Sequence, residues 1–304
     1  MGKINYAAID IGSNAVRLLI KSIDEDAITP AFTKEQLLRV PLRLGEDTFS
    51  SGSISSEKEK KLLRLIKAYR QLLKIYDVKV CRACATSAVR DAANGKELIK
   101  TIGKKTGIRI EIINGEEEAR LIYDNHIEEI LDKETNYIYV DVGGGSTEIS
   151  LINAGELKNS RSYNIGTVRL LEGTVKNSTR TRLRRDMNQF ATIYPNIQII
   201  GSGGNINRLF RLADVPNKNN IELPVEKLRQ INTQLKELTP EERMVKYKLR
   251  PDRADVITHA ADIFLEVADQ AKASLILVPT IGLVDGIIDS LYTRDRKTAP
   301  TEKA

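Results

Sequence analysis

The sequence predicts an α/β protein made of two similar halves, and three observations support this fold class. The chain has 304 residues, which is too many for one small core. Segments typical of strands alternate with segments typical of helices, and one strand-turn-strand motif occurs twice. We therefore expect two domains, spanning residues 1–124 and 125–304.

The repeated motif is the most informative feature of the sequence. YAAIDIGSNAVRLLI, which begins at Tyr6, superposes on YIYVDVGGGSTEISL, which begins at Tyr137, at a constant offset of 131 residues. Each copy contains an apolar strand, the pattern Asp-x-Gly, a run of small residues and a second strand. This pattern predicts two β-hairpins with Asp10 and Asp141 at the ends of their first strands.

Such glycine turns have a known chemistry. Successive backbone N–H groups can form a concave nest for phosphate oxygens, and a nearby carboxylate can hold Mg²⁺ or its waters. One copy would be an ordinary turn, but two copies suggest duplicated domains that face each other across a cleft with phosphate between them.

The remaining elements of the first half follow from local patterns. A Ser56 to Glu59 capping box precedes apolar residues at helical spacing, which predicts a helix from about Ser56 to Tyr76. The strand VKVCRACA, the polar turn TSAVRDAANG, a helix near Lys96 to Lys105, the strand IRIEII and a helix opening at GEEEARLIY follow.

The second half repeats this order more loosely. We expect the strands YIYVDV, TEISLIN and LKNSRSYNI, a basic helix from about Thr179, the strand IQIIGSGG and a helix from Ile206. Helices near Val225 to Leu238 and Ala254 to Ala271, the strand SLILVP and a last helix, GLVDGIIDSLY, complete the chain.

Composition excludes several chemistries and locations. Two cysteines and two isolated histidines, His126 and His259, cannot build a disulfide framework or a four-ligand zinc site. Cys81 and Cys84 form a C-x-x-C pattern within a strand, which favours two buried thiols over a redox or metal motif. With no run of about 18 apolar residues and no signal-peptide pattern, we expect a cytoplasmic protein without a membrane partner.

The positive charge is local. Residues 155–185 carry eight basic residues and two acidic ones, which equals the net charge of +6 of the whole chain. Such a stretch suits a polyanionic partner or is simply a solvated helix face. Nucleic acid is an unlikely partner, since the run TRTRLRR contains no aromatic residue for base stacking.

Six segments, taken together, resemble one family. They are IDIGSNAVRLLI from Ile9, ATSAVRDAANG from Ala85, GEEEARLIY from Gly115, VDVGGGSTEISL from Val140, GSGGNINRL from Gly201 and RADVI from Arg253. The chain resembles the short members of the exopolyphosphatase/guanosine pentaphosphate phosphohydrolase (Ppx/GppA) family. This resemblance implies two duplicated ribonuclease H-like domains of the acetate and sugar kinase/Hsp70/actin superfamily with an interdomain cleft.

The resemblance also implies the site residues. Phosphate loops are expected at Gly12, Ser13 and Asn14 and at Gly143, Gly144, Gly145 and Ser146. Arg90 would clamp phosphate, and Asp141 and Glu148 would hold Mg²⁺ or possibly Mn²⁺, with Asp10 as the equivalent acid of the first repeat. Glu118 matches the catalytic base, although acids also favour a helix N-terminus for purely structural reasons.

Three positions depart from the family pattern: Ala15 replaces the usual Ser, Asn205 replaces Thr, and Val284-Asp285 replaces Arg and Glu. The expected function is Mg²⁺-dependent release of the terminal phosphate from polyphosphate, or alternatively from guanosine pentaphosphate. An ATP-dependent kinase and a non-catalytic sensor of polyphosphate or guanosine tetra- and pentaphosphate are further alternatives. Short relatives suggest a homodimer, by analogy only.

Overall fold

The computed structural model describes residues 3–27, 31–123, 132–215, 221–279 and 282–298. Backbone contacts divide the chain into two compact units, which we call unit 1 (Met1–Asn114 with Leu283–Ala304) and unit 2 (Gly115–Gly282). The predicted division after residue 124 lies outside the described residues, as does His126. The units differ from the predicted domains because residues 115–123 belong to unit 2 and residues 283–298 to unit 1.

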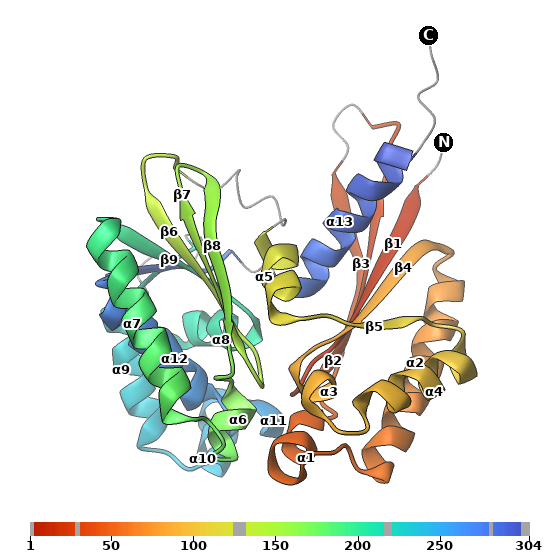
Figure 1. Ribbon diagram of the computed structural model, residues 1–304, viewed down its shortest axis with the longest axis horizontal. Helices are drawn as coiled ribbons and strands as arrows, with labels where there is room; N and C mark the ends of the chain where they lie inside the picture. The colour runs from red at the N-terminus through yellow and green to blue at the C-terminus, as the bar shows by residue number, and fades with distance from the viewer. Residues whose placement is uncertain (1–2, 28–30, 124–131, 216–220, 280–281, 299–304) are drawn as a thin grey trace. The chain divides into compact units, whose positions relative to one another are not determined.

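Unit 1 is a five-stranded sheet covered by helices (Figure 1). Its elements are β1 (Ile4–Ile11), β2 (Val16–Ile23), β3 (Phe32–Val40), α1 (Leu44–Ser51), α2 (Ser56–Ile75), β4 (Val78–Ala85), α3 (Ser87–Asp91), α4 (Gly95–Thr106), β5 (Ile110–Ile112) and α13 (Leu283–Thr298). The strand order is β3-β2-β1-β4-β5. β1 and β3 are antiparallel to β2, and β4 and β5 continue the sheet parallel to β1.

Unit 2 repeats this plan with additions. Its elements are α5 (Gly115–Tyr123), β6 (Asn136–Val142), β7 (Thr147–Asn153), β8 (Glu156–Tyr163), α6 (Thr167–Leu171), α7 (Asn177–Ile193), β9 (Ile197–Ser202), α8 (Gly204–Leu212), β10 (Glu222–Pro224), α9 (Val225–Lys236), α10 (Pro240–Tyr247), α11 (Pro251–Ala254), α12 (Ile257–Ala271) and β11 (Leu275–Leu277). Its strand order is β10-β11-β9-β6-β7-β8. Without the added β10, this is the strand order of unit 1, which confirms the predicted duplicated fold.

The two hairpins of the sequence repeat have the same register. Asp10 pairs with Arg17 across β1 and β2, and Asp141 pairs with Glu148 across β6 and β7. Both positions are separated by the 131 residues of the sequence repeat. The repeat therefore fixes which side chains face each other, because opposite residues of an antiparallel pair lie on the same face of the sheet.

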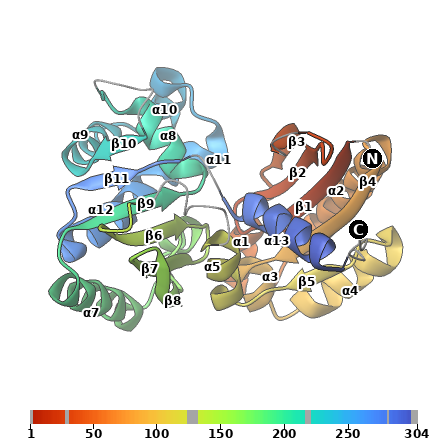
Figure 2. The ribbon, with the colours of Figure 1, turned by 90° about the horizontal axis from the view of Figure 1, so that it is seen from above.

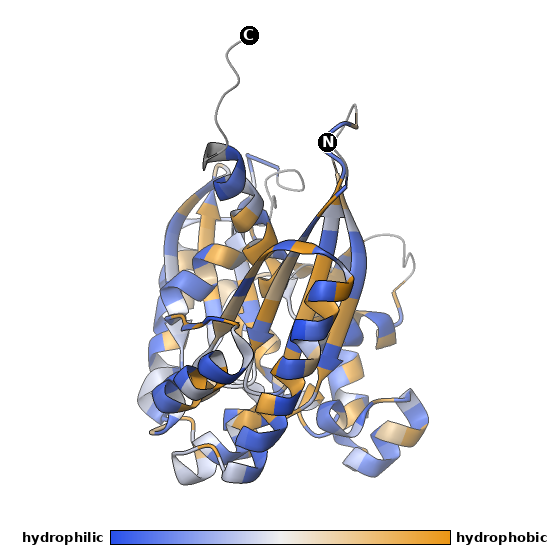
Figure 3. Ribbon diagram, turned by 90° about the vertical axis from the view of Figure 1, so that its right-hand side faces the viewer, coloured by the Kyte–Doolittle hydropathy of each residue, from blue (hydrophilic) through white to orange (hydrophobic). Residues whose placement is uncertain are grey.

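Helix α2 illustrates how the sequence forms the helical layer. Its buried residues Leu62, Ile66 and Tyr69 recur at helical spacing and face the sheet. The N-cap is Ser55, whose Oγ accepts a hydrogen bond from the backbone N–H of Lys58, so the cap lies one residue before the predicted box. Figure 3 shows hydrophobic residues along the strands of unit 1, whereas the surrounding helices alternate between hydrophilic and hydrophobic positions.

The C-terminal helix α13 packs against β1 and β2 of unit 1 (Figure 2). Tyr6 Oη donates to Asp295 Oδ2 over 2.6 Å, and the Tyr6 ring packs edge-on against Tyr292. Asp285 forms an ion pair of 2.7 Å with Lys21, and Val284 is buried. The Val284-Asp285 departure from the family pattern therefore has a structural role, since both residues help to attach α13 to unit 1.

Both cysteines lie on a strand, as the sequence analysis predicts. Cys84 is buried and Cys81 is half-buried on β4, and both are free thiols. Burial raises the pKa of Cys81 to about 12, so its thiol is protonated at neutral pH. Across the described ranges, no helix is both long and apolar enough to cross a bilayer.

Candidate active site

The second glycine loop, residues 143–146, is held through its carbonyl groups. Gly143 O accepts a hydrogen bond from Thr167 N, and Gly144 O accepts one from Val168 N at 2.8 Å. The donors are the first amides of α6, which would otherwise be unsatisfied. Gly166 must be glycine here, because a Cβ at this position would lie only 2.4 Å from Gly145 N.

Arg169 adds a side-chain contact to the same loop. It lies on α6, and its Nε donates to the carbonyl oxygen of Gly145 over 2.8 Å. Sequence analysis included Arg169 only as part of a basic stretch. The structure places its guanidinium against the predicted phosphate loop instead.

The first glycine loop, residues 12–15, is supported in the same way. Ser13 O accepts from Gly45 N at 2.8 Å, and Asn14 O accepts from Arg43 N at 3.0 Å. These donors lie at the start of α1, directly after the third strand of unit 1. In each unit a short helix after the third strand therefore binds the carbonyl side of the glycine loop.

The sequence analysis did not predict α1 or α6, although the sequence contains a glycine pattern that indicates both helices. Gly45 and Gly52 bracket α1, and Gly166 and Gly173 bracket α6, at a common offset of 121 residues. The second glycine of each pair has a positive φ, 81° at Gly52 and 65° at Gly173, and ends its helix. A G-x6-G pattern after the third strand of each half thus predicts the helix that supports the loop.

The hairpin of unit 2 brings two acids face to face. Asp141 and Glu148 are direct partners across β6 and β7, and Glu148 is 2% exposed. Ser162 Oγ donates to Glu148 Oε1 over 2.8 Å. A Cβ at Gly203, before α8, would lie 2.9 Å from Asp141 Oδ1, so only glycine leaves room for this carboxylate.

The hairpin of unit 1 places a base, in place of a second acid, opposite its aspartate. Arg17 occupies the position that Glu148 holds in the repeat, and its Nη1 donates to Asp10 Oδ2 over 2.6 Å. Burial raises the pKa of Asp10, and the ion pair with Arg17 opposes this rise. The carboxylate of Asp10 is therefore compensated within the protein.

Glu118 belongs to the same unit as the paired acids. It lies in the first turn of α5 and is buried, whereas Glu116 is exposed. Helix α5 packs on β8, where a Cβ at Gly115 would lie 2.2 Å from the Cβ of Ser162. Since Ser162 also donates to Glu148, one serine links the start of α5 to the carboxylate pair.

Arg90 lies in unit 1, on α3. Its Nη1 donates to the carbonyl oxygen of Ile113 over 2.8 Å, directly after β5. The Oγ atoms of Ser13 and Ser87 lie 2.9 Å apart, which joins the first glycine loop to the start of α3. The structure thus groups loop 12–15 with Arg90 in unit 1, and loop 143–146 with Asp141, Glu148 and Glu118 in unit 2.

Several bases of the stretch of residues 155–185 form ion pairs within unit 2. Arg180 and Arg184 both pair with Glu266, at 2.8 and 2.6 Å. Arg161 and Arg185 both pair with the buried Asp186. Burial opposes ionisation of Asp186, but its hydrogen bonds outweigh this effect and hold its pKa below the ordinary value.

A further base of this stretch also has a contact within unit 2. The guanidinium of Arg182 lies over the Tyr163 ring, 5.1 Å from its centroid. These bases therefore have structural contacts within unit 2, although Glu266 and Asp186 offset only two of the positive charges.

No group of three or more His, Cys, Asp or Glu side chains arranged for a metal ion occurs within the described ranges. The protein offers the pair Asp141 and Glu148. Magnesium sites commonly use one or two carboxylates, with waters and substrate phosphates as the other ligands. Glu148 is buried and faces the half-buried Asp141, and a cation is favoured beside two facing carboxylates, so this pair fits Mg²⁺.

The duplicated α/β fold, the glycine loops and the facing acids are features suited to phosphate chemistry. Residues 19–295 match the model of the Ppx/GppA phosphatase family. The chain therefore belongs to this family and is a phosphoanhydride hydrolase.

Individual relatives agree with this assignment. The chain is 27% identical to exopolyphosphatase 2 of Mycobacterium tuberculosis, over 96% of this chain and 99% of that protein. It is 29% identical to a bifunctional 3-dehydroquinate synthase/phosphatase of Fusobacterium nucleatum, over 90% of this chain but only 44% of that longer protein.

Solved structures show the same fold. The Ppx/GppA family member of Aquifex aeolicus is 25% identical, with a TM-score of 0.76 over 96% of this chain and 99% of that one. An exopolyphosphatase of Cytophaga hutchinsonii is 24% identical, with a TM-score of 0.80 over 96% of this chain and 98% of that one.

We predict that Gly166→Ala lowers the rate of phosphate release at least ~10-fold, because the added Cβ would displace the loop at Gly144 and Gly145. The matched control is Gly173→Ala at the other end of α6, where nothing lies within 4 Å of the added Cβ. Because residue 173 has a positive φ, the alanine should cost about 1 kcal/mol of stability without loss of rate. Phosphate release and thermal unfolding of both variants check this prediction, and equal rates would contradict it.

Proposed function

We propose that the protein hydrolyses the terminal phosphoanhydride bond of inorganic polyphosphate and releases phosphate. The single observation that carries this proposal is the arrangement in unit 2, where an acid pair stands beside a glycine loop whose carbonyls are already engaged. The exopolyphosphatase of M. tuberculosis, which matches over nearly its full length, supports this substrate. Guanosine pentaphosphate is the alternative, because the family name covers both activities.

The glycine loop would bind the terminal phosphate through its amides. Its carbonyl groups at Gly143, Gly144 and Gly145 accept hydrogen bonds from α6 and Arg169. Gly143 N–H donates to Ser146 O within the loop, so the N–H groups of Gly144, Gly145 and Ser146 are the candidates for an anion, and fixed amides stabilise charge that develops on phosphate oxygens. Loop 12–15 and Arg90 are the corresponding candidates of unit 1.

Asp141 and Glu148 would hold Mg²⁺. When bound, the ion supplies positive charge to the oxygens of the reacting phosphate. Ser162 orients Glu148 through its hydrogen bond, and Gly203 keeps the space around Asp141 open. Asp10 was expected to be a metal ligand too, but we do not include it, because its charge is compensated by Arg17.

Glu118 would act as the general base. It would accept a proton from a water whose oxygen bonds to the terminal phosphorus, while the bridging P–O bond breaks and its electron pair leaves with the shortened chain. Phosphoryl transfer depends mainly on positioning and electrostatic stabilisation, so a carboxylate fixed on a packed helix suffices. The burial of Glu118 on α5 supports this role.

The proposal is tested by comparing substrates. Purified protein with Mg²⁺ is incubated with polyphosphate of several lengths, with guanosine pentaphosphate, and with ATP in the presence and absence of an acceptor. We expect the fastest phosphate release from polyphosphate. Release from guanosine pentaphosphate alone would select the alternative, acceptor-dependent ATP consumption would indicate a kinase, and no turnover of any substrate would refute the proposal.

We predict that Glu118→Gln lowers turnover of the preferred substrate by 10²-fold to 10⁴-fold, the usual contribution of a general base. Glu116→Gln is the matched control, because it removes the same charge from the same helix turn at an exposed position. It should keep its rate within about twofold. Substrate binding should persist in both variants, and an unchanged rate in Glu118→Gln would remove it from the mechanism.

Removal of divalent metal by EDTA should abolish turnover, and Mg²⁺ should restore it. We predict that Glu148→Gln raises the Mg²⁺ concentration for half-maximal rate at least ~10-fold, because one of two charged ligands is lost. Asp10→Asn should leave this concentration within about twofold, whatever it does to stability, because Asp10 pairs with Arg17. Titrations of Mg²⁺ against rate separate these outcomes, and similar shifts in both variants would make Asp10 a metal ligand.

A further inference from the structure

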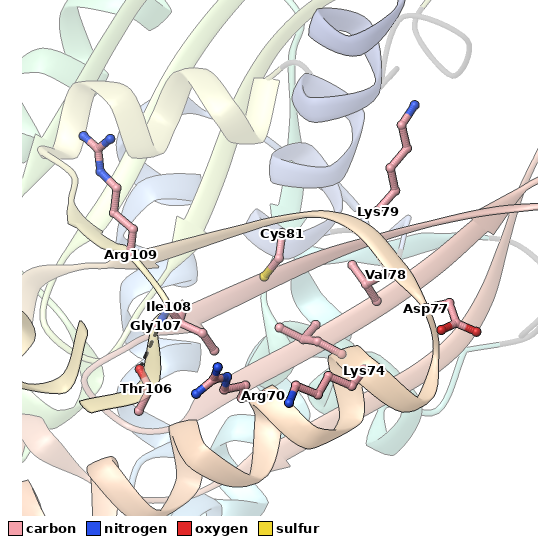
Figure 4. A pocket seen from close by; sticks show the side chains of 11 residues that line it. Arg70, Lys74, Asp77, Val78, Lys79, Cys81, Thr106, Gly107, Ile108 and Arg109 are labelled. Atoms are coloured by element: carbon pink, nitrogen blue, oxygen red, sulfur yellow. Dashed lines mark hydrogen bonds between the residues drawn. The ribbon is translucent and has the colours of Figure 1, made fainter. Parts of the chain in front are cut away.

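Unit 1 contains a basic pocket that the proposed reaction does not use. It has a volume of about 700 Å³ and lies between α2, the start of β4 and the segment that joins α4 to β5. Arg70, Lys74, Lys79 and Arg109 line it, with Asp77 as the one acid. Figure 4 shows Arg70 and Lys74 next to each other on α2, with the Cys81 sulfur pointing toward them from β4.

Three of the four bases of this pocket have no acidic partner among the described residues. Lys79 pairs with Asp295 at 2.7 Å. Within the part of the chain that the structure describes, no ion pair or hydrogen bond joins the side chains of Arg70, Lys74 or Arg109 to an acid. Clustered cations of this kind repel each other and favour a bound anion.

A second basic pocket, in unit 2, differs from this one because its bases pair with acids. Its volume is about 450 Å³, and its bases Arg180, Arg184, Arg229 and Lys236 are also close together. Each of them has an acidic partner, since Glu266 pairs with both Arg180 and Arg184. Arg229 pairs with Asp269, and Lys236 with Asp262, both at 2.7 Å. Proximity of bases alone therefore does not make an anion site in this protein. Of these two pockets, the one in unit 1 has three bases without an acidic partner among the described residues.

The shape and lining of the pocket indicate a small molecule. Pockets for such ligands have volumes of about 300 to 1,000 Å³ and combine apolar walls with a few polar groups. Leu73, Val78 and Ile108 supply the apolar part of the lining. Because its pKa is raised by burial, the thiol of Cys81 is neutral and adds no negative charge that would repel an anion.

The pocket is separate from the predicted phosphate loop of unit 1. It lies at the start of β4, at Val78, whereas Thr86 at the other end of β4 donates to Ile11 beside that loop. A strand of this length spans about 20 Å or more. A ligand in the pocket therefore does not contact the glycine loop of unit 1.

We propose that this pocket binds a small anion that carries two or more phosphates. The guanidinium of Arg70 can take two phosphate oxygens at once, and Lys74 supplies a second positive charge one helical turn away. The ligand is either a nucleoside diphosphate, whose base would cover the apolar wall, or a short inorganic phosphate chain. The proposal stands on the pocket alone and does not depend on the hydrolytic function.

The test uses two ligands that cannot be hydrolysed, α,β-methylene-ADP and methylenediphosphonate, which differ only in the adenosine. Each is titrated into the full-length protein, and binding is followed through the NMR signal of the Ile108 methyl group in the pocket wall. We expect a saturable shift of this signal with at least one ligand. A response to α,β-methylene-ADP alone would identify a nucleoside diphosphate, and equal responses would identify an inorganic phosphate chain.

The double variant Arg70→Ala/Lys74→Ala should weaken this binding at least tenfold. Both residues are exposed on α2, and a thermal melt verifies that the variant folds. Arg229→Ala/Lys236→Ala is the control, since it removes the same charge from the self-compensated pocket of unit 2 and should change binding less than twofold. A silent Ile108 signal at millimolar ligand, or equal affinities of the two double variants, would overturn the proposal.

Discussion

Charge compensation across two equivalent hairpins is the constraint on which the site depends. In both units an aspartate ends the first strand and faces one residue of the second strand. In unit 1 that residue is Arg17, and its ion pair with the buried Asp10 is neutral within the protein. In unit 2 it is Glu148, and the same geometry sets two carboxylates opposite each other, an arrangement that a bound cation stabilises. One difference in residue type thus separates a structural hairpin from a candidate metal-binding hairpin.

Much of this arrangement could be predicted from the sequence. The offset of 131 residues between the repeats is also the offset between their strand pairs, so the positions of Asp10 and Asp141 followed from the repeat. Long amphipathic helices such as α2 were predictable because their apolar spacing is regular. Short helices such as α1 and α6 have five to eight residues and give too weak a periodic signal, so the G-x6-G pattern is what indicates them.

Other features depended on contacts that are distant in the sequence. The eight bases of residues 155–185 indicated a charged surface, but Glu266 and Asp186 each hold two of them in ion pairs. Glu266 comes from α12, about eighty residues later, and local composition cannot reveal such a pairing. The same holds for α13, which follows unit 2 in the sequence but packs on β1 of unit 1 through Tyr6 and Asp295. Charge counts along a chain therefore overestimate the charge that a partner would meet.

The packing of α5 determines whether Glu118 and Glu148 keep a fixed position relative to each other. The sequence suggested a division after this helix, which would have placed Glu118 and Glu148 in different domains. The structure instead packs α5 on β8, because Gly115 allows its backbone to approach Ser162. Ser162 in turn donates to Glu148, so the candidate base and the acid pair belong to one compact unit. Their spacing is then set by the core of unit 2 and not by the relation between the units, which is what a reaction that depends on positioning requires.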